Sequence, residues 1–302
     1  KTVYNTLLGE LWEDRGDLAD EDEMLTRRED YGTRPDGTLV ELPEGVLVLT
    51  CGVDTQDDRL EYEVVGWGHY GENWGIKKGI IMGDPNDDEV WLRLDDVVGH
   101  VYKFENGRGL TVSMTFVDSG GHKTQSVYKH CRERQGRRVF AIKGQGGDGV
   151  PFTRPPSKVK IVVSGRAIGQ AWLYNLGVDA GKADIMGALK VQEAGPKYCH
   201  FPRGADRGYD AAYFNGLMSE RMTMKTTNGR TRWVWEKLIG HERNEPLDCR
   251  NYAMAALRVL DPDMDAVERR IKGLGAQPAN SPAAERRQRR RGAQKRSYGD
   301  DW

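Results

Sequence analysis

The 302-residue sequence lacks several features that would fix its class at once. No apolar run approaches the roughly 20 residues that a membrane-spanning helix requires. The four cysteines are scattered without a C-x-x-C pair, and no set of histidines and cysteines has the spacing of zinc ligands. We therefore expect reduced thiols, no zinc site and no membrane segment, as in a cytosolic protein.

A P-loop is also missing from the sequence. The Gly-rich stretch KGQGGDGV at 143–150 does not end in the Lys-Ser/Thr pair of the G-x-x-x-x-G-K-[ST] motif. We therefore expect no ATPase activity in this chain.

Opposite charges nearly cancel, giving a formal net charge of −1, but they are unevenly distributed. Residues 283–302 hold seven Lys or Arg and three Asp or Glu, so this segment carries +4 and the rest of the chain −5. The Arg-rich stretch at 285–296 has the composition of a disordered basic arm. The negative body argues against strong DNA binding by the body alone, because neutralising phosphates requires Lys and Arg.

What the sequence does contain is a regular succession of apolar patterns. The order β-β-β-α-β-α-β is predicted, with short connections that favour antiparallel hairpins among the first three strands. The strand-helix-strand order that follows implies parallel pairing. The predicted fold class is thus α/β, a mixed sheet of three antiparallel strands and then parallel strands, flanked by helices. The strands are expected at 45–54, 59–68, 74–83, 110–117 and 137–144, and the helices at 88–104 and from about 120 to 134.

The remaining patterns divide the chain into three parts. Residues 1–42 read as a polar arm with one short helix, 43–262 as the folded domain and 263–302 as a disordered basic tail. Within the domain, a helix over 244–260 is strongly indicated. Weaker patterns predict a strand at 157–165, helices at 179–192 and 208–221, and a hairpin at 222–238 that turns at Asn228–Gly229.

Three aspartates stand at the ends of these elements. Asp54 closes the first strand, Asp118 closes the fourth, and Asp248 lies in the first turn of the last long helix. If the two strands are neighbours, the carboxylates meet, and a divalent cation such as Mg²⁺ or Mn²⁺ would offset their repulsion. Lys143, at the end of the next strand, could neutralise a phosphate there. Each residue also has a simpler interpretation. Asp54 could be a hairpin residue and Asp118 a turn residue or helix cap. Asp248 could only complement the helix dipole, and Lys143 could be an ordinary solvated lysine.

Four segments in this order carry a family resemblance: LTCGVDTQDDRLEYEVVGWG, FVDSGGHKTQSVYKHC, FPRGADRGYDAAYFNGLMSER and RNEPLDCRNYAMAAL. Together they resemble the large terminase subunit of tailed phages, the lambda-like GpA family, over about residues 1–262. The resemblance implies the C-terminal nuclease domain with its RNase H-like fold, and makes residues 1–42 the linker after a missing ATPase domain. The family's metal ligands then fall on Asp54, Asp118 and Asp248.

The resemblance also implies a function and partners. The chain would be a metal-dependent endonuclease that cuts concatemeric viral DNA by two-metal-ion phosphodiester hydrolysis, with Asp54 bridging both ions. Implied partners are double-stranded viral DNA, the procapsid portal through the C-terminal tail, and the small terminase subunit in the full-length protein, all in the host cytoplasm. Two alternatives stay open: another RNase H-like nuclease of the resolvase or transposase type, and a non-catalytic module that binds DNA or portal.

Overall fold

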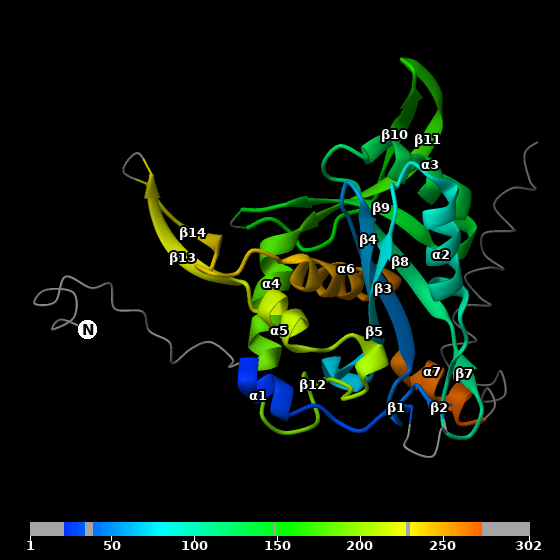
Figure 1. The fold of residues 1–302 in the computed structure, drawn as a ribbon, viewed down its shortest axis with the longest axis vertical. Helices are drawn as coiled ribbons and strands as arrows, with labels where there is room; N and C mark the ends of the chain where they lie inside the picture. The colour runs from blue at the N-terminus through cyan, green and yellow to red at the C-terminus, as the bar shows by residue number, and fades with distance from the viewer. Residues whose placement is uncertain (1–20, 34–38, 148, 228–229, 274–302) are drawn as a thin grey trace, which may run out of the picture. The chain divides into compact units, whose positions relative to one another are not determined.

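An eight-stranded mixed sheet is the central element of the computed structural model, which describes residues 21–33, 39–147, 149–227 and 230–273 (Figure 1). The chain divides into two units, Lys1–Asp261 and Pro262–Trp302. The sheet belongs to the larger unit. Its strand order is β10-β11-β9-β8-β3-β4-β5-β12. The strands are β3 (Val48–Thr55), β4 (Arg59–Trp67), β5 (Asn73–Met82), β8 (Val112–Asp118), β9 (Val139–Gln145), β10 (Ser157–Val163), β11 (Arg166–Gly177) and β12 (Cys199–His200).

The middle of the sheet has the topology predicted from the sequence. Strands β3, β4 and β5 form antiparallel pairs, whereas β8 lies beside β3 and β9 beside β8 in parallel. The order β5-β4-β3-β8-β9 with these directions is the RNase H-like arrangement, so the predicted fold class is confirmed. Strand β3 lies at the centre, and its residues from Val48 to Asp54 are all buried, as expected of a strand covered on both faces.

Helices cover both faces of this sheet. On one face, Leu49, Cys51 and Val53 of β3 share a core with α2 (Asp88–Gly99) and α3 (Thr124–Arg134). On the other, Phe116 of β8 packs with Tyr252 of the long helix α6 (Glu245–Leu260). Helices α4 (Val178–Leu189) and α5 (Ala211–Leu217) lie on the α6 side (Figure 1).

Smaller elements complete the larger unit. A hairpin of β13 and β14 pairs antiparallel outside the main sheet. The turn predicted at Asn228–Gly229 lies outside the described residues. The other elements are α1 (Glu21–Thr26), β1 (Gly32–Thr33), β2 (Leu39–Val40), β6 (Tyr102–Lys103), β7 (Gly109–Leu110), β13 (Glu220–Thr227), β14 (Arg230–Lys237), and 3₁₀ turns at His69–Gly71, Gln135–Arg137 and Ala205–Arg207.

Within the larger unit, the largest differences between the sequence-based assignments and the structure are at two helix ends and one strand. The helix expected to 104 ends at Gly99, where His100 turns to extended backbone, and the helix expected over 208–221 is α5 alone, because Glu220 begins β13. The 12-residue strand β11 was not predicted. Its sequence, RAIGQAWLYNLG, mixes polar residues and glycines with apolar ones on an irregularly buried strand, so no clear alternation is visible.

The smaller unit contains helix α7 (Met264–Ile271), in a segment that was expected to be a disordered tail. Asp263 caps this helix by accepting a hydrogen bond from the Ala266 N–H at 2.9 Å. The basic stretch at 285–296 lies outside the described residues. Among the helices that the structure describes, none combines the length and apolar character needed to span a bilayer.

Candidate functional site

Parallel pairing of β3 and β8 brings Asp54 and Asp118 together. The register places Val53 opposite Val117, so the two aspartates follow as neighbours at the carboxyl ends of adjacent strands. Side chains alternate along a strand, and both aspartates therefore lie on the face that carries Phe116 and α6. The two strands are thus sheet neighbours, which was the condition for the two carboxylates to meet.

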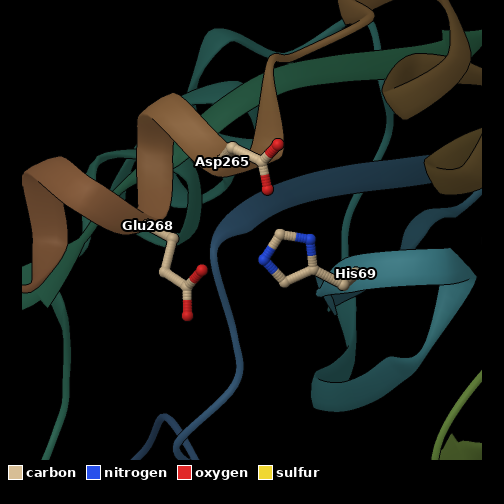
Figure 2. A group of neighbouring side chains, drawn as sticks. All are labelled: His69, Asp265 and Glu268. Atoms are coloured by element: carbon tan, nitrogen blue, oxygen red, sulfur yellow. The ribbon is translucent and has the colours of Figure 1, made fainter.

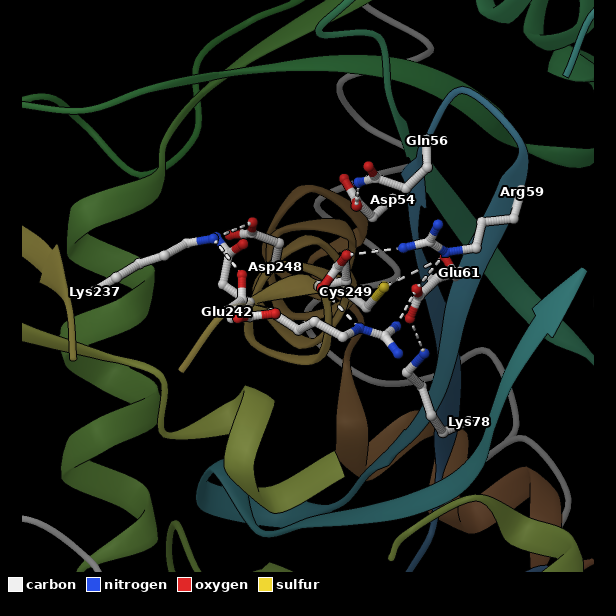
Figure 3. Close-up of polar contacts among 12 residues, drawn as sticks. Asp54, Gln56, Arg59, Glu61, Lys78, Lys237, Glu242, Asp248 and Cys249 are labelled. Atoms are coloured by element: carbon white, nitrogen blue, oxygen red, sulfur yellow. Dashed lines mark hydrogen bonds and ion pairs between the residues drawn. The ribbon is translucent and has the colours of Figure 1, made fainter. Parts of the chain in front are cut away.

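Helix α6 delivers the third aspartate because it approaches β3 closely at Gly52. A Cβ atom on Gly52 would lie 1.8 Å from the carbonyl oxygen of Cys249 and 2.7 Å from the Ala253 nitrogen. Thr50 stabilises the same contact, because its Oγ1 donates a hydrogen bond to the Ala253 carbonyl oxygen at 2.7 Å. The first turn of α6, with Asp248, therefore lies beside the end of β3, as Figure 3 shows.

The pKa values of the three carboxyls are all raised, mainly by burial. For Asp54, which is 6% exposed, burial and the neighbouring charges of Asp248 and Asp118 raise the pKa to about 7. Burial raises the pKa of Asp248 to about 6, with Lys182 opposing the shift and Glu220 and Asp118 adding to it. Burial also raises the pKa of Asp118, although the Gly120 and Ser119 backbone N–H groups and Lys143 pull it down.

Other polar groups fix the orientation of Asp54 and Asp248. Gln56 donates from Nε2 to Asp54 Oδ2 at 2.5 Å (Figure 3). Asn244, just before α6, donates from Nδ2 to Asp248 Oδ2 at 2.9 Å. The structure thus brings the three predicted aspartates together and supports two of them by hydrogen bonds to side-chain amides.

Lys143, the fourth predicted residue, is exposed and lies close enough to Asp118 to affect its pKa. It follows Ile142, which pairs with Asp118 in the β8–β9 register, and its charge lowers the pKa of Asp118. An exposed ammonium group at this edge of the sheet is accessible to a phosphate from solution.

Lys182 and Glu220 were missed by the sequence reasoning. Lys182 of α4 lies 2.8 Å through Nζ from Glu220 Oε2 and 3.4 Å from Asp248 Oδ1, and both charged residues are buried. Lys182 ends no predicted strand and lies in none of the four family segments, and Glu220, although it lies in the third segment, ends no predicted strand. The only signal was a lysine on the apolar side of a predicted helix, which is uninformative without its partners.

A second charged cluster lies beside the aspartates, around Glu61 on β4. Glu61 pairs in register with Asp54, is fully buried, and accepts from Arg59 Nε and Lys78 Nζ, each at 2.8 Å (Figure 3). Burial alone would raise the pKa of Glu61, but Lys78, Arg59 and Arg243 hold it below its usual range. The negative charge of Glu61 is therefore compensated internally by Lys78, Arg59 and Arg243.

The chemistry of the donors suits a hard divalent ion. Three carboxylates supply oxygen ligands of the kind that Mg²⁺ and Mn²⁺ prefer. The described residues of the larger unit contain no three ligand atoms of His, Cys, Asp or Glu that all lie within 4.8 Å of one another. Side chains must therefore move before all three carboxylates can bind one ion. Of the three, Asp248 is the one paired with a buried lysine, Lys182.

The smaller unit carries its own acidic pair. Asp265 and Glu268 lie one turn apart on α7, as Figure 2 shows, and Glu268 forms an ion pair with Lys272 at 2.6 Å. We assign these residues no part in the aspartate site, which is built entirely by the larger unit.

The sheet and its acidic edge place the chain in the class of RNase H-like α/β proteins. Within this class, the model of the endonuclease domain of the terminase large subunit gpA matches residues 1–269, and the chain belongs to this family. The expectation drawn from the four sequence segments is confirmed.

Individual relatives agree with the family assignment. The chain is 34% identical to the terminase large subunit of Escherichia phage lambda over 264 residues, covering 86% of the chain and 38% of that protein. It is 31% identical to the terminase large subunit of Enterobacteria phage P21, covering 86% and 39%. The chain thus spans under two-fifths of the length of either relative. A solved large terminase from a thermophilic bacteriophage aligns over 74% of the chain and 42% of that structure, with 11% identity and a TM-score of 0.39.

Proposed function

We propose that this chain is a metal-dependent endodeoxyribonuclease that cuts concatemeric viral DNA during packaging. The observation that carries the proposal is the convergence of Asp54, Asp118 and Asp248 from β3, β8 and α6 on one face of the sheet edge. Buried like charges are costly unless a cation compensates them, and the family is one of endonucleases. We propose Mg²⁺ or Mn²⁺ as the cation, with two ions in the complete site.

The three aspartates would hold the ions, which when bound would activate a water and clamp the phosphodiester oxygens. Asp54, whose pKa is raised by the charges of both other aspartates, would be the ligand shared by the two ions. Gln56 and Asn244 orient the carboxylates of Asp54 and Asp248 through their amide hydrogen bonds. Lys143 would contact the phosphate from the solvent side.

The proposal extends to partners. Double-stranded viral DNA is the proposed substrate, and the portal and the small terminase subunit are the proposed packaging partners of the full-length protein. The host cytoplasm is the compartment where concatemeric DNA would be met. The relatives that carry the terminase name are much longer than this chain, so the activity of the isolated chain is a separate matter from that of the whole subunit.

The first prediction tests cleavage directly. The purified chain should nick supercoiled plasmid in Mn²⁺ and stop when EDTA removes the ion. Asp54→Asn and Asp248→Asn should each lower the nicking rate by more than about 100-fold, because they remove a ligand rather than an outer partner. The readout is the conversion of supercoiled to open-circular plasmid on agarose gels, with circular dichroism to check folding.

Asp57→Asn is the matched control, since Asp57 lies three residues from Asp54 but its side chain is 69% exposed. It should cleave like the wild type. Full activity in Asp54→Asn or Asp248→Asn would refute the site. A strong preference for branched over linear DNA would favour the resolvase alternative, and metal-independent DNA binding without cleavage would favour the non-catalytic one.

A further inference from the structure

Lys182 is the one cation buried directly against the candidate metal ligands among the described residues. It is 7% exposed on α4, and its Nζ lies 2.8 Å from Glu220 Oε2 and 3.4 Å from Asp248 Oδ1. Glu220 is the first residue of β13 and is 6% exposed. The ammonium group is thus shared between a proposed metal ligand and a carboxylate with no proposed role.

Asn244 completes this arrangement from the other side. Its Nδ2 donates to Glu220 Oε1 at 2.8 Å and to Asp248 Oδ2 at 2.9 Å. Both oxygens of Asp248 therefore have a partner, Lys182 on Oδ1 and Asn244 on Oδ2. A divalent ion that uses Asp248 must compete with Lys182 for the same carboxylate.

Glu220 can remain paired with Lys182 when a divalent ion displaces the lysine from Asp248. A buried ammonium group without a partner carries a large desolvation cost. The Lys182–Glu220 contact is shorter than the Lys182–Asp248 contact, so the lysine keeps a counter-ion when Asp248 turns to a metal.

We propose that Lys182 is a positioning residue that serves as the exchangeable counter-ion of Asp248. Without a divalent cation it holds Asp248 and offsets its charge, and with the cation it is retained by Glu220. The inference rests on the proposed function, because it requires Asp248 to be a metal ligand. It assigns roles to two residues that contact neither metal nor DNA.

The exchange predicts effects of opposite sign for two variants. Lys182→Met removes the competing cation, so Mn²⁺ should bind about tenfold more tightly, in the range typical of partners that adjoin metal ligands. Glu220→Gln removes the alternative partner, so Lys182 stays on Asp248 and Mn²⁺ should bind about tenfold more weakly. A merely structural role would shift both affinities the same way or not at all.

The chain contains a closely matched control. Lys78 is also 7% exposed, and its Nζ also lies 2.8 Å from a buried glutamate, Glu61. Lys78 makes no contact with the three aspartates among its described interactions. Lys78→Met should lower the melting temperature without changing Mn²⁺ affinity by more than about twofold.

Mn²⁺ affinity is measured by calorimetric titration and by electron paramagnetic resonance of the free ion, with melting temperatures recorded with and without Mn²⁺. If Lys182→Met does not fold, Glu220→Gln and the Lys182→Met/Glu220→Gln pair, which removes both partners of the Lys182–Glu220 ion pair together, carry the test. The pair should bind Mn²⁺ more tightly than Glu220→Gln alone.

The outcomes separate the two proposals. If the wild-type protein binds no Mn²⁺, or binds it with the same affinity as Asp248→Asn, both the metal site and this inference are overturned. A second outcome overturns only the inference. In that case Asp248→Asn abolishes Mn²⁺ binding, but Lys182→Met and Glu220→Gln shift the Mn²⁺ affinity in the same direction or leave it unchanged. Opposite shifts with an unchanged Lys78→Met support it.

Discussion

At the scale of single residues, Asp54 has the most altered chemistry in the site. Its carboxyl is buried between two other acids, and its pKa is raised to about 7, while that of Asp248 is raised to about 6. In an unfolded chain both would titrate near 4. Between about pH 4 and pH 7, the folded protein therefore still holds protons on these carboxyls that the unfolded chain has already released.

This difference predicts how stability depends on pH. Below about pH 4 the raised pKa values have no effect, because both states are protonated, and between about pH 4 and pH 7 the free energy of unfolding should fall as pH rises. Saturating Mn²⁺ should flatten this fall, since the ion binds the deprotonated carboxylates of the folded state. Urea unfolding at several pH values, with and without Mn²⁺, measures both effects.

Asp54→Asn is the comparison variant for this prediction. An amide cannot titrate, so the metal-free variant should lose much of the decline in stability between about pH 4 and pH 7. An equal decline in the variant would mean that other groups dominate the pH dependence.

The candidate-site residues that could be predicted from the sequence share one property. Asp54, Asp118 and Asp248 each end or begin an element whose pattern is clear, so their positions follow from local structure. Lys182 and Glu220 become neighbours only because α4 and β13 pack against α6, and no local pattern encodes that contact. The sequence therefore predicts the three aspartates of the candidate site but not the lysine that pairs with Asp248.

At the scale of elements, the contact between β3 and α6 sets the geometry of the site. Gly52 has no room for a side chain, because its Cβ would lie 1.8 Å from a backbone oxygen that cannot rotate away. The position therefore controls how near Asp248 comes to Asp54.

Gly52→Ala should push α6 away from the sheet. We expect a loss of about 3 kcal/mol in the free energy of unfolding, at the upper end of the usual cost of overpacking, and a weaker Mn²⁺ affinity. Gly187→Ala in α4 is the control, since nothing lies within 4 Å of its added methyl, and it should be neutral or stabilising by up to about 1 kcal/mol. Urea unfolding and Mn²⁺ titration of both variants check this; a Gly52→Ala protein with unchanged stability and affinity would contradict it.

The elements themselves were predictable where one physical signal dominated. The buried run of β3 and the apolar stripe of α6 match their predicted ranges closely. Strand β11 was invisible because it is exposed along much of its first half, so burial does not impose alternation. The short α5 was extended too far because Met218 and Glu220 continue an apolar and charged pattern that the backbone does not follow.

At the scale of the whole molecule, charge separates the body from the tail. Residues 283–302 carry +4 against −5 for the rest, and they lie outside the described residues. Two readings of this segment compete: docking on an acidic surface of the portal, and contact with DNA phosphates. We favour docking, because the final SYGDDW adds aromatic and acidic groups that phosphate binding does not need.

Deleting residues 283–302 tests these readings. Docking predicts that binding to purified portal or procapsid is lost while plasmid nicking stays within about twofold of the full chain, since none of the three aspartates is deleted. Binding to DNA and to portal should be measured at several salt concentrations. Portal binding that survives, with a shallower salt dependence of DNA binding, would make the tail a DNA arm.

The spread of the three aspartates along the chain also orders events during synthesis. Asp54 and Asp118 leave the ribosome before Asp248, which follows 130 residues after Asp118, and α6 must dock on β3 before the three aspartates come together. Domains fold as units once their sequence is available. If the proposed function holds, a nascent chain that ends before α6 lacks the complete aspartate site and should not cleave nucleic acids, and the same holds for any proteolytic fragment that ends before α6.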